Sequence, residues 1–388
     1  MRSLFISILF ALVLHAVGVA QSREDKINRL IQMGMEDIRI VEADTMCYVS
    51  FEDNIYRSPA NGISEVIRAL RSVDSLSNYQ LVLVDEGVPQ INISVPRGEW
   101  VSEVSYNTDD VTRVLRDEKA QNRTAGRVDL VLYPELYLAN NWYDKLYGVA
   151  VNISPAVEMR LWRGATGVAQ VVIPLYTNMT DEKQYVRPGV LALRQQVKIY
   201  KQLIGELSIG NFQDDRIGVD LALSYYLANG RWGVGARGGL SGSSTFYGGE
   251  WVISRLQRVT WDAWVSYYEP NYGLEFKLAA VRKIYGDTGV QGELSRRFGE
   301  VMIGFWSSYT TALNGGFNFT VTLPCDRRLK RNRGFRVTYP EYYSFNYKAR
   351  NGGNEELYGY SYNTRPDAGS LDSYFNPNYI MTELQKRK

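Results

Sequence analysis

The chain has 388 residues and a formal net charge of +2, and it is rich in tyrosine (28 residues) and glycine (34 residues). Its one histidine, His15, lies in the N-terminal apolar segment, so the remaining residues offer no imidazole. Histidine-based zinc sites, Ser-His-Asp hydrolysis and Cys-His catalysis are therefore excluded. We expect no catalytic residues, no metal, no cofactor and no nucleic-acid partner.

The first 20 residues have the pattern of a secretory signal peptide. Arg2 supplies a positive start, Leu4 to Val17 is almost continuously apolar, and small residues end at Ala20 before Gln21. This predicts export and cleavage after Ala20. An anchor helix would need about 20 apolar residues, more than this run has. Because no later run is long enough to cross a bilayer as a helix, a membrane-resident mature chain would have to cross as a closed β-barrel.

Residues 21–96 are predicted to form a small α/β domain, which we expect in the periplasm. The pattern leaves open a binding or docking module, a plug and a scaffold. A helix is expected over Arg23 to Met33, with Ile27, Leu30 and Ile31 on one face and Gly34 ending it. Strand-like alternation then predicts the order α-β-β-α-β-β. The predicted apolar face of the second helix consists of Ile63, Val66, Ile67, Leu70 and Val73.

Two features accompany this predicted domain. Cys47 lies in a strand-like pattern, so we expect a buried thiol with a small apolar role rather than a disulfide to Cys325. Residues 97–125 are polar and rich in charge, and they are predicted to be a linker.

Residues 126–324 change to a period of two, which predicts a mainly β fold: an antiparallel up-and-down transmembrane β-barrel of about 12 strands. Between Ile217 and Ala228, apolar side chains alternate with small and charged ones, and Asn229-Gly230 then predicts a hairpin turn. A soluble β-sandwich also alternates. Three features favour the barrel: strand lengths of about 10 residues or more, tight turns, and the mixed charges of the second face.

One face of these strands is predicted to line the lumen of the barrel. The candidate lumen-facing residues are Asp220, Arg237, Asp262, Trp264, Tyr268, Glu275, Lys277 and Glu293. Two carboxylates such as Asp220 and Asp262 can serve a glycosidase, but ion pairing with Arg237 or Lys277 is the better interpretation. The aromatic residues expected at the membrane interfaces, or in two cases in the lumen, are Trp142, Tyr143, Trp232, Trp251, Trp261, Trp264, Tyr267 and Tyr268.

Two further segments are interpreted as irregular. Gly239 to Ser243 has part of a nucleophile-elbow pattern, but without a histidine we interpret it as a turn. Residues 325–388 are rich in Tyr, Gly, Asn and Pro without a period, which predicts an irregular extension. The basic run from Arg327 to Arg333 is expected to be a solvated loop.

Several short motifs resemble the YjbH-like exopolysaccharide biosynthesis family. They are Phe51 to Arg57, Asp85 to Pro89, Arg187 to Gln195, Gly210-Asn211-Phe212 with Gly218-Val219-Asp220, Tyr225 to Trp232, and Leu294 to Gly299. The resemblance covers most of residues 35–325. It implies an outer-membrane barrel joined to small α/β domains, with a role in extracellular polysaccharide production and no established catalytic residues. The chain corresponds to about one unit of a usually longer protein.

Three functions compete at this point. The first is a non-enzymatic outer-membrane protein that assists export or assembly of an extracellular polysaccharide. Its expected partners are outer-membrane lipid, the polysaccharide and other envelope export proteins. The second is a general porin or diffusion channel. The third is a structural or adhesive surface protein that acts through its Tyr-rich tail.

Overall fold

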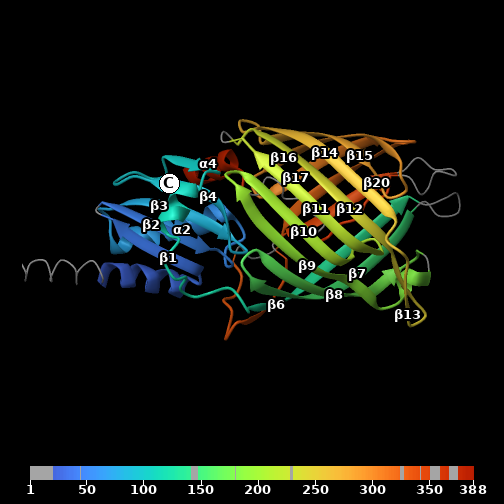
Figure 1. The fold of residues 1–388 in the computed structure, drawn as a ribbon, viewed down its shortest axis with the longest axis horizontal. Coiled ribbons are helices and arrows are strands. Elements are labelled where there is room, and N and C mark those ends of the chain that lie inside the picture. The colour runs from blue at the N-terminus through green and yellow to red at the C-terminus, as the bar shows by residue number, and fades with distance from the viewer. Residues whose placement is uncertain are drawn as a thin grey trace, which may run out of the picture. The chain divides into compact units, whose positions relative to one another are not determined.

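The computed structural model describes residues 21–43, 45–140, 147–179, 181–227, 230–323, 327–340, 342–349, 359–366 and 375–388. The predicted signal peptide (1–20), Trp142, Tyr143, Asn229 and Cys325 lie outside the described residues. The chain divides into two compact units. The first comprises Met1–Thr124 with Ile380–Lys388, and the second comprises Ala125–Tyr379. Both contain β-sheet, so the fold is mainly β (Figure 1).

The described part of the first unit contains a five-stranded sheet of order β1-β2-β3-β4-β5, in which β2 and β3 pair in parallel and the other neighbours pair antiparallel. A helix over residues 21–33 precedes it. The next elements are β1 (Glu36–Ala43), β2 (Met46–Glu52), α2 (Pro59–Val73), β3 (Asn78–Asp85) and β4 (Val88–Val95). The elements therefore follow the predicted order up to Val95. That this unit folds independently stays a prediction.

Helix α2 connects the two parallel strands and covers the sheet with its apolar side. Pro59 suits the first turn because its missing N–H would have no partner there. Ile63, Val66, Ile67 and Leu70 are buried at the predicted spacing, whereas Val73, at the last position of the helix, is 37% exposed.

The first helix buries two of its three predicted residues, Ile27 and Leu30. The exception is Ile31, which is 37% exposed. The buried face of this helix is therefore narrower than predicted by one residue. Cys47 is buried in β2, as expected for a small apolar role. Burial raises the pKa of its thiol to about 12, an effect that the nearby Lys26 only partly offsets. The thiol is therefore neutral at physiological pH.

The predicted linker is part of the first unit, which corrects the domain boundaries. It contains β5 (Glu103–Ser105), which pairs with β4, and α3 (Asp109–Val114). Val111 and Leu115 are buried against Val82 and Val84 of the sheet. The many charged residues of this segment suggest a linker, but its few apolar side chains are enough to hold it against the sheet.

The second unit contains one 15-stranded sheet, whose long strands lie side by side (Figure 1). Its first strands are β6 (Val128–Asn140), β7 (Tyr147–Trp162), β8 (Ala165–Thr177), β9 (Arg187–Tyr200), β10 (Leu203–Phe212), β11 (Arg216–Tyr226) and β12 (Trp232–Tyr247). The next are β13 (Glu250–Ile253), β14 (Arg258–Glu269), β15 (Leu274–Arg282), β16 (Thr288–Phe298), β17 (Val301–Tyr309) and β18 (Leu313–Thr322). A short 3₁₀ helix, η1 (Asp181–Gln184), precedes β9.

In the described part of this sheet, neighbouring strands pair antiparallel except at β6, which forms two parallel pairings. Strand β11 pairs with β10 and, along its whole length, with β12. Strand β6 pairs antiparallel with β7, but it pairs in parallel with β19 (Phe335–Thr338) and, at the single position Lys348↔Ala139, with β20 (Tyr342–Ala349). Strand β20 also pairs antiparallel with β18.

The C-terminal segment corrects two expectations. Residues 325–388 contain β19, β20 and α4 (Pro377–Gln385), so they are not an irregular extension. The described part of the sheet also has 15 strands rather than about 12, because β13 and β19 have only four residues each and β20 lies in the Tyr-rich segment that the sequence predicts to be irregular. The Gly239 to Ser243 segment lies inside β12 and is not a turn.

The basic run from Arg327 to Arg333 is largely an exposed loop, as predicted, but the side chain of one of its arginines is covered. Arg331 has a side chain that is only 3% exposed, and both it and Arg336 of β19 form ion pairs with Asp129 of β6. The ion pair of Arg331 cannot be predicted from the local sequence, because its acidic partner lies about 200 residues away.

Candidate functional site

The second-unit sheet has two faces of opposite character, and the eight predicted site residues share one of them. The strand register places Arg237 opposite Asp262, Tyr268 opposite Glu275, and Lys277 opposite Glu293. Asp220 lies opposite Gly239, two positions from Arg237 on β12. Residues that face one another across a ladder point to the same side of the sheet. We call this side the polar face.

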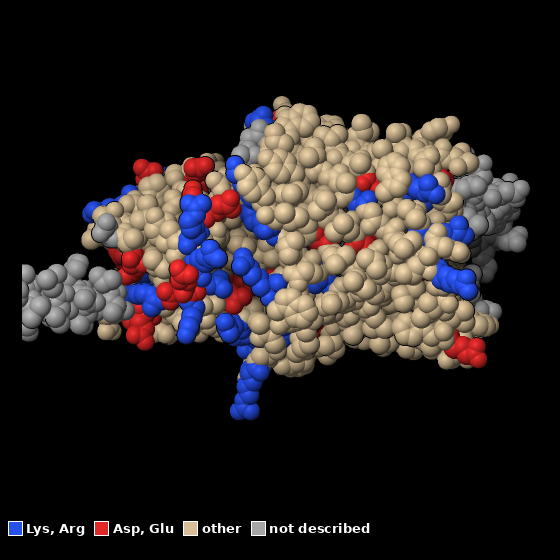
Figure 2. All heavy atoms as spheres, in the orientation of Figure 1, with Lys and Arg blue, Asp and Glu red and all other residues tan. Residues whose placement is uncertain are grey.

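The opposite side of the sheet, which we call the apolar face, is exposed and carries aliphatic and aromatic residues. On β11 and β15, Leu221 is 49% exposed and Leu278 is 59% exposed, whereas their neighbours Asp220 and Ala279 are buried. The strand surface of the second unit that is visible in Figure 2 is largely uncharged. Exposed residues of this kind recur on strand after strand. They include Leu207, Ile209, Val219, Leu223, Val234, Leu240, Val259, Val265, Phe276, Val290, Leu294, Ile303 and Phe305.

The aromatic residues divide between the two faces as their parity predicts. Trp232 (45% exposed) and Trp261 (41% exposed) belong to the apolar face, and the ring of Trp232 lies 4.8 Å from that of Tyr267. Trp264 and Tyr268 lie on the polar face, where Tyr268 is buried. The Lys277 ammonium stands 4.7 Å from the centroid of the Trp264 ring, a cation–π contact.

The centre of the polar face is an ion pair between Asp220 and Arg237. The Arg237 Nε donates to both carboxylate oxygens of Asp220, at 2.8 and 3.0 Å. The Asp220 side chain is 5% exposed and that of Arg237 is 30% exposed. Arg237 thus pairs with Asp220 rather than with Asp262, which faces it directly across the ladder. Glu293 accepts a hydrogen bond from Asn318 Nδ2 at 3.2 Å.

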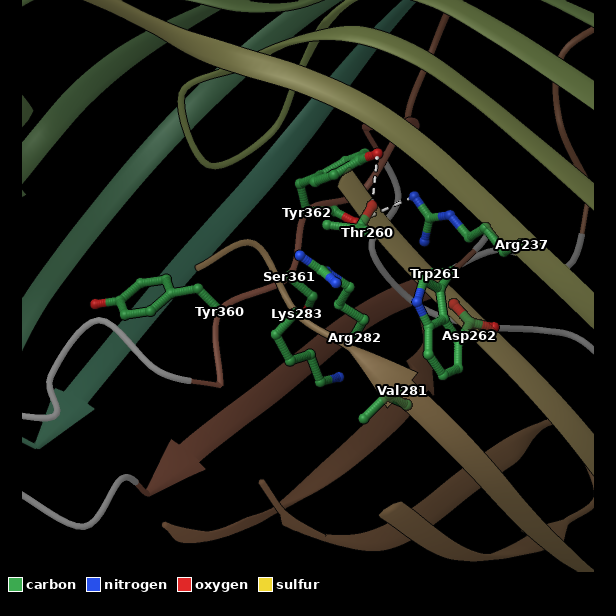
Figure 3. Close-up of a pocket in the computed structure, with 10 residues that line it drawn as sticks. All are labelled: Arg237, Thr260, Trp261, Asp262, Val281, Arg282, Lys283, Tyr360, Ser361 and Tyr362. Atoms are coloured by element: carbon green, nitrogen blue, oxygen red, sulfur yellow. Dashed lines mark hydrogen bonds between the residues drawn. The ribbon is translucent and has the colours of Figure 1, made fainter. Parts of the chain in front are cut away.

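A segment far along the chain lies on this ion pair. We call residues 359–366 the C-terminal strap. Tyr362 is 3% exposed, and its Oη donates to Asp220 Oδ2 at 2.9 Å. Arg237 Nη2 donates to the Tyr362 carbonyl oxygen at 3.3 Å, and the Arg237 guanidinium lies 5.1 Å from the Tyr362 ring centroid. Figure 3 shows Arg237 and Thr260 reaching toward Tyr362.

The remainder of the strap is held to the same end of the strands. Gln213, which follows β10, donates its backbone N–H to the Asn363 carbonyl at 2.9 Å and its Nε2 to the Pro366 carbonyl at 2.8 Å. Asp287, which follows β15, accepts from the Gly359 N–H at 2.9 Å. Arg365 forms an ion pair with Glu206 of β10. The strap thus crosses the polar face from β10 to β15.

The C-terminal part of the second unit contacts the opposite strand ends. Asn376 Nδ2 donates to the carbonyl of Gly230 in the β11–β12 turn at 2.7 Å. Tyr379 Oη donates to the carbonyl of Gly299 in the β16–β17 turn at 3.1 Å, and the Arg297 guanidinium lies 4.5 Å from its ring centroid. The described segments after β20 therefore contact both ends of the strands.

A small cavity of about 40 Å³ remains between the strap and strands β12, β14 and β15 (Figure 3). Arg237, Asp262, Lys283 and Tyr360 contribute to its lining. It is large enough for a water molecule or two and too small for a sugar ring. Sequence analysis missed the strap altogether, because a segment without period gives no indication of which surface it will cover.

Neither the family models nor the curated proteins contain a match to the chain. The resemblance to YjbH-like proteins therefore stays a prediction. Among the described residues, no helix is both long and apolar enough to cross a membrane.

Proposed function

We propose that this chain is a non-enzymatic outer-membrane β-barrel protein that assists the export or assembly of an extracellular polysaccharide. The observation that carries the proposal is the contrast between the two faces of the 15-stranded sheet. An exposed apolar face that extends over many strands is far larger than the few hundred Å² that soluble monomers usually expose. Contact with lipid accounts for it.

The strand pairing supports closure of the sheet into a barrel. If β13 and β19 are left out as short accessory strands, thirteen of the 15 strands remain. An odd number of strands can close only if one neighbouring pair is parallel, and β6 with β20 is such a pair. The β11–β12 ladder supplies the other connection that a closed order requires. Closure removes the free edges that would otherwise invite aggregation.

The polar face suits a sugar polymer better than an ion of one sign. It combines both charges, as in Asp220 with Arg237, with aromatic residues such as Trp264 and Tyr268. Sugars offer hydroxyl groups for hydrogen bonding and C–H faces for stacking, and the motifs similar to YjbH-like proteins point to the same substrate class. The strap on the polar face argues against a permanently open diffusion channel. The burial of Tyr362 also argues against the use of this tyrosine in external adhesion.

Experiments in cells can test the membrane location of the protein and its role in polysaccharide export separately. The mature protein should fractionate with outer membranes and show heat-modifiable mobility on gels. Trp264→Leu, on the polar face, should leave both properties intact and reduce extracellular polysaccharide, whereas Trp261→Leu, on the apolar face, is the matched control. Release of the protein by carbonate would contradict the barrel. Normal polysaccharide with the Trp264 variant and with a complete deletion would contradict the export role.

A further inference from the structure

The C-terminal strap binds to the polar face in a manner that resembles a ligand in a site. The Tyr362 ring stacks on Phe212 with centroids 5.4 Å apart and an interplanar angle of 4°. Phe212 follows Ser208 by four positions on β10, and Ser208 lies opposite Asp220, so Phe212 points to the polar face. Both rings are almost fully buried, at 1% and 3% exposure. Near-parallel stacking on a buried aromatic ring is a specific geometry rather than loose coverage.

The sheet is shaped to accept the Tyr362 phenol. A β-carbon on Gly239 would stand 1.8 Å from Tyr362 Oη, 2.8 Å from Thr260 Oγ1 and 2.9 Å from Asp220 Oδ2. Glycine is otherwise unfavourable inside a strand, and it is used where another group approaches the backbone closely. By contrast, a β-carbon on the adjacent Gly238, on the apolar face, would meet nothing within 4 Å.

The groups around the Tyr362 hydroxyl provide both donors and acceptors. Asp220 accepts from it at 2.9 Å, and Thr260 Oγ1 lies 3.3 Å from it. Arg237 donates to the main-chain carbonyl of the same residue at 3.3 Å. A carboxylate and a guanidinium beside an aromatic platform match a sugar ring, whose hydroxyls donate and accept while its C–H face stacks.

We propose that Phe212, Asp220 and Arg237 form a sugar-binding subsite, and that Tyr362 of the C-terminal strap occupies this subsite and blocks the barrel until a polysaccharide segment displaces it. This inference rests on the proposed function, because it assigns the substrate class and the gate to the same polar face. The strap is a suitable occupant because it is part of the chain. Its high effective concentration keeps the subsite filled when no polymer is present.

The gate is tested with the full chain in planar lipid bilayers. Tyr362→Ala removes the occupant, and Gly239→Ala expels it without altering the strap. Both variants should raise the single-channel conductance several-fold above that of the wild type, and Gly238→Ala should not. Heat-modifiable mobility of each variant establishes that it is folded. If Tyr362→Ala and Gly239→Ala both fold and their conductance does not exceed that of the wild type, the strap is not the gate.

The subsite is tested with maltohexaose, a linear neutral oligosaccharide, as the probe. It should block the current through the Tyr362→Ala channel, and Phe212→Leu in that background should weaken the block about tenfold. Phe212→Tyr, which keeps an aromatic face, should restore it. Calorimetry of maltohexaose binding to the same variants in detergent gives this comparison without insertion of the protein into a bilayer. A wild-type protein that never inserts would contradict the proposed barrel, whereas a Phe212→Leu substitution that leaves the maltohexaose affinity of the Tyr362→Ala protein unchanged would overturn the subsite alone.

Discussion

Asp129 and Arg336, 207 residues apart in the sequence, form a buried ion pair that joins β6 to β19. Arg336 Nη2 lies 2.6 Å from Asp129 Oδ2, and the Arg336 side chain is 1% exposed. Arg331 donates to the same carboxylate at 2.7 and 2.8 Å. One carboxylate of β6 therefore holds two guanidinium groups on the strand that takes part in both parallel pairings of the described part of this sheet.

Asp129→Asn should destabilise the second unit by about 3 kcal/mol, because it removes the negative charge that two covered guanidinium groups share. The measurement is the urea midpoint of the change in heat-modifiable mobility. Asp215→Asn is the matched control, since Asp215 pairs with Lys183 at 2.9 Å but its side chain is 36% exposed. That control should change the stability by less than about 1 kcal/mol. Equal effects of the two variants would contradict the structural role of the Asp129 cluster.

Introducing a charge should distinguish the two faces of β11. Leu221→Arg places a guanidinium on the apolar face, where lipid contact would cost about 2–4 kcal/mol near the midplane. Ser224→Arg places the same group on the polar face of the same strand. The fraction of protein that resists carbonate extraction should fall for Leu221→Arg and stay close to the wild-type value for Ser224→Arg. A larger loss with Ser224→Arg would reverse the assignment of the faces.

A fragment of residues 23–96 should fold, but it should be less stable than a fragment of residues 21–124. The longer fragment retains Val111 and Leu115, which cover Val82 and Val84. Each such side chain contributes about 1.5–3 kcal/mol when it is fully buried. Urea unfolding followed by circular dichroism measures the difference. Random-coil spectra from both fragments would contradict an independently folding unit.

The stability of the 21–124 fragment should also depend on pH through Asp74. Burial alone would raise the pKa of Asp74, but hydrogen bonds from Ser77 and Lys26 outweigh burial and hold this pKa at about 2. Since the pKa of an unfolded aspartate is near 3.9, this stabilisation is present above about pH 4 and is lost as the pH falls toward 2. It amounts to roughly 1 kcal/mol after solvent screening.

The pH measurement is urea unfolding of the fragment at several values between pH 2 and pH 7, with Asp74→Asn as the comparison. The variant should be less stable than the wild type at pH 7, because Lys26 is buried and would lose a partner at 2.9 Å. The two should converge near pH 2. A constant difference across this range would show that the Asp74 carboxylate does not account for the effect.

The sequence predicts the faces of the strands well, for a simple physical reason. A strand exposes alternate residues to opposite sides, so the parity of Asp220, Asp262 and Trp264 follows from the backbone alone. The same reasoning fails for the C-terminal strap, because Tyr362 is positioned by Phe212 and Asp220 rather than by its neighbours in the sequence. It fails likewise for Arg331, whose charge suggests a solvated loop because its acidic partner is distant in the sequence.

The segment boundaries show the same limit. Residues 97–125 contain few apolar positions, and only the fold reveals that Val111 and Leu115 are covered by the sheet. The odd positions of β20 are apolar and its even positions after Tyr342 are polar, but this alternation covers only eight residues within a segment that otherwise has no period. Alternation in the sequence identifies a strand when its two faces differ in polarity. It cannot identify a segment whose position depends on contacts with residues far away in the sequence.

The central claim, a barrel with its apolar face in lipid and its polar face inward, is tested most directly by quenching with brominated lipids. Leu278 and Ala279 are adjacent on β15, one 59% exposed and the other 8% exposed. A fluorophore attached to cysteine at each position, in a background without native cysteines, should be strongly quenched at 278 and weakly at 279 in vesicles with brominated acyl chains. Absence of quenching at both positions would contradict the barrel.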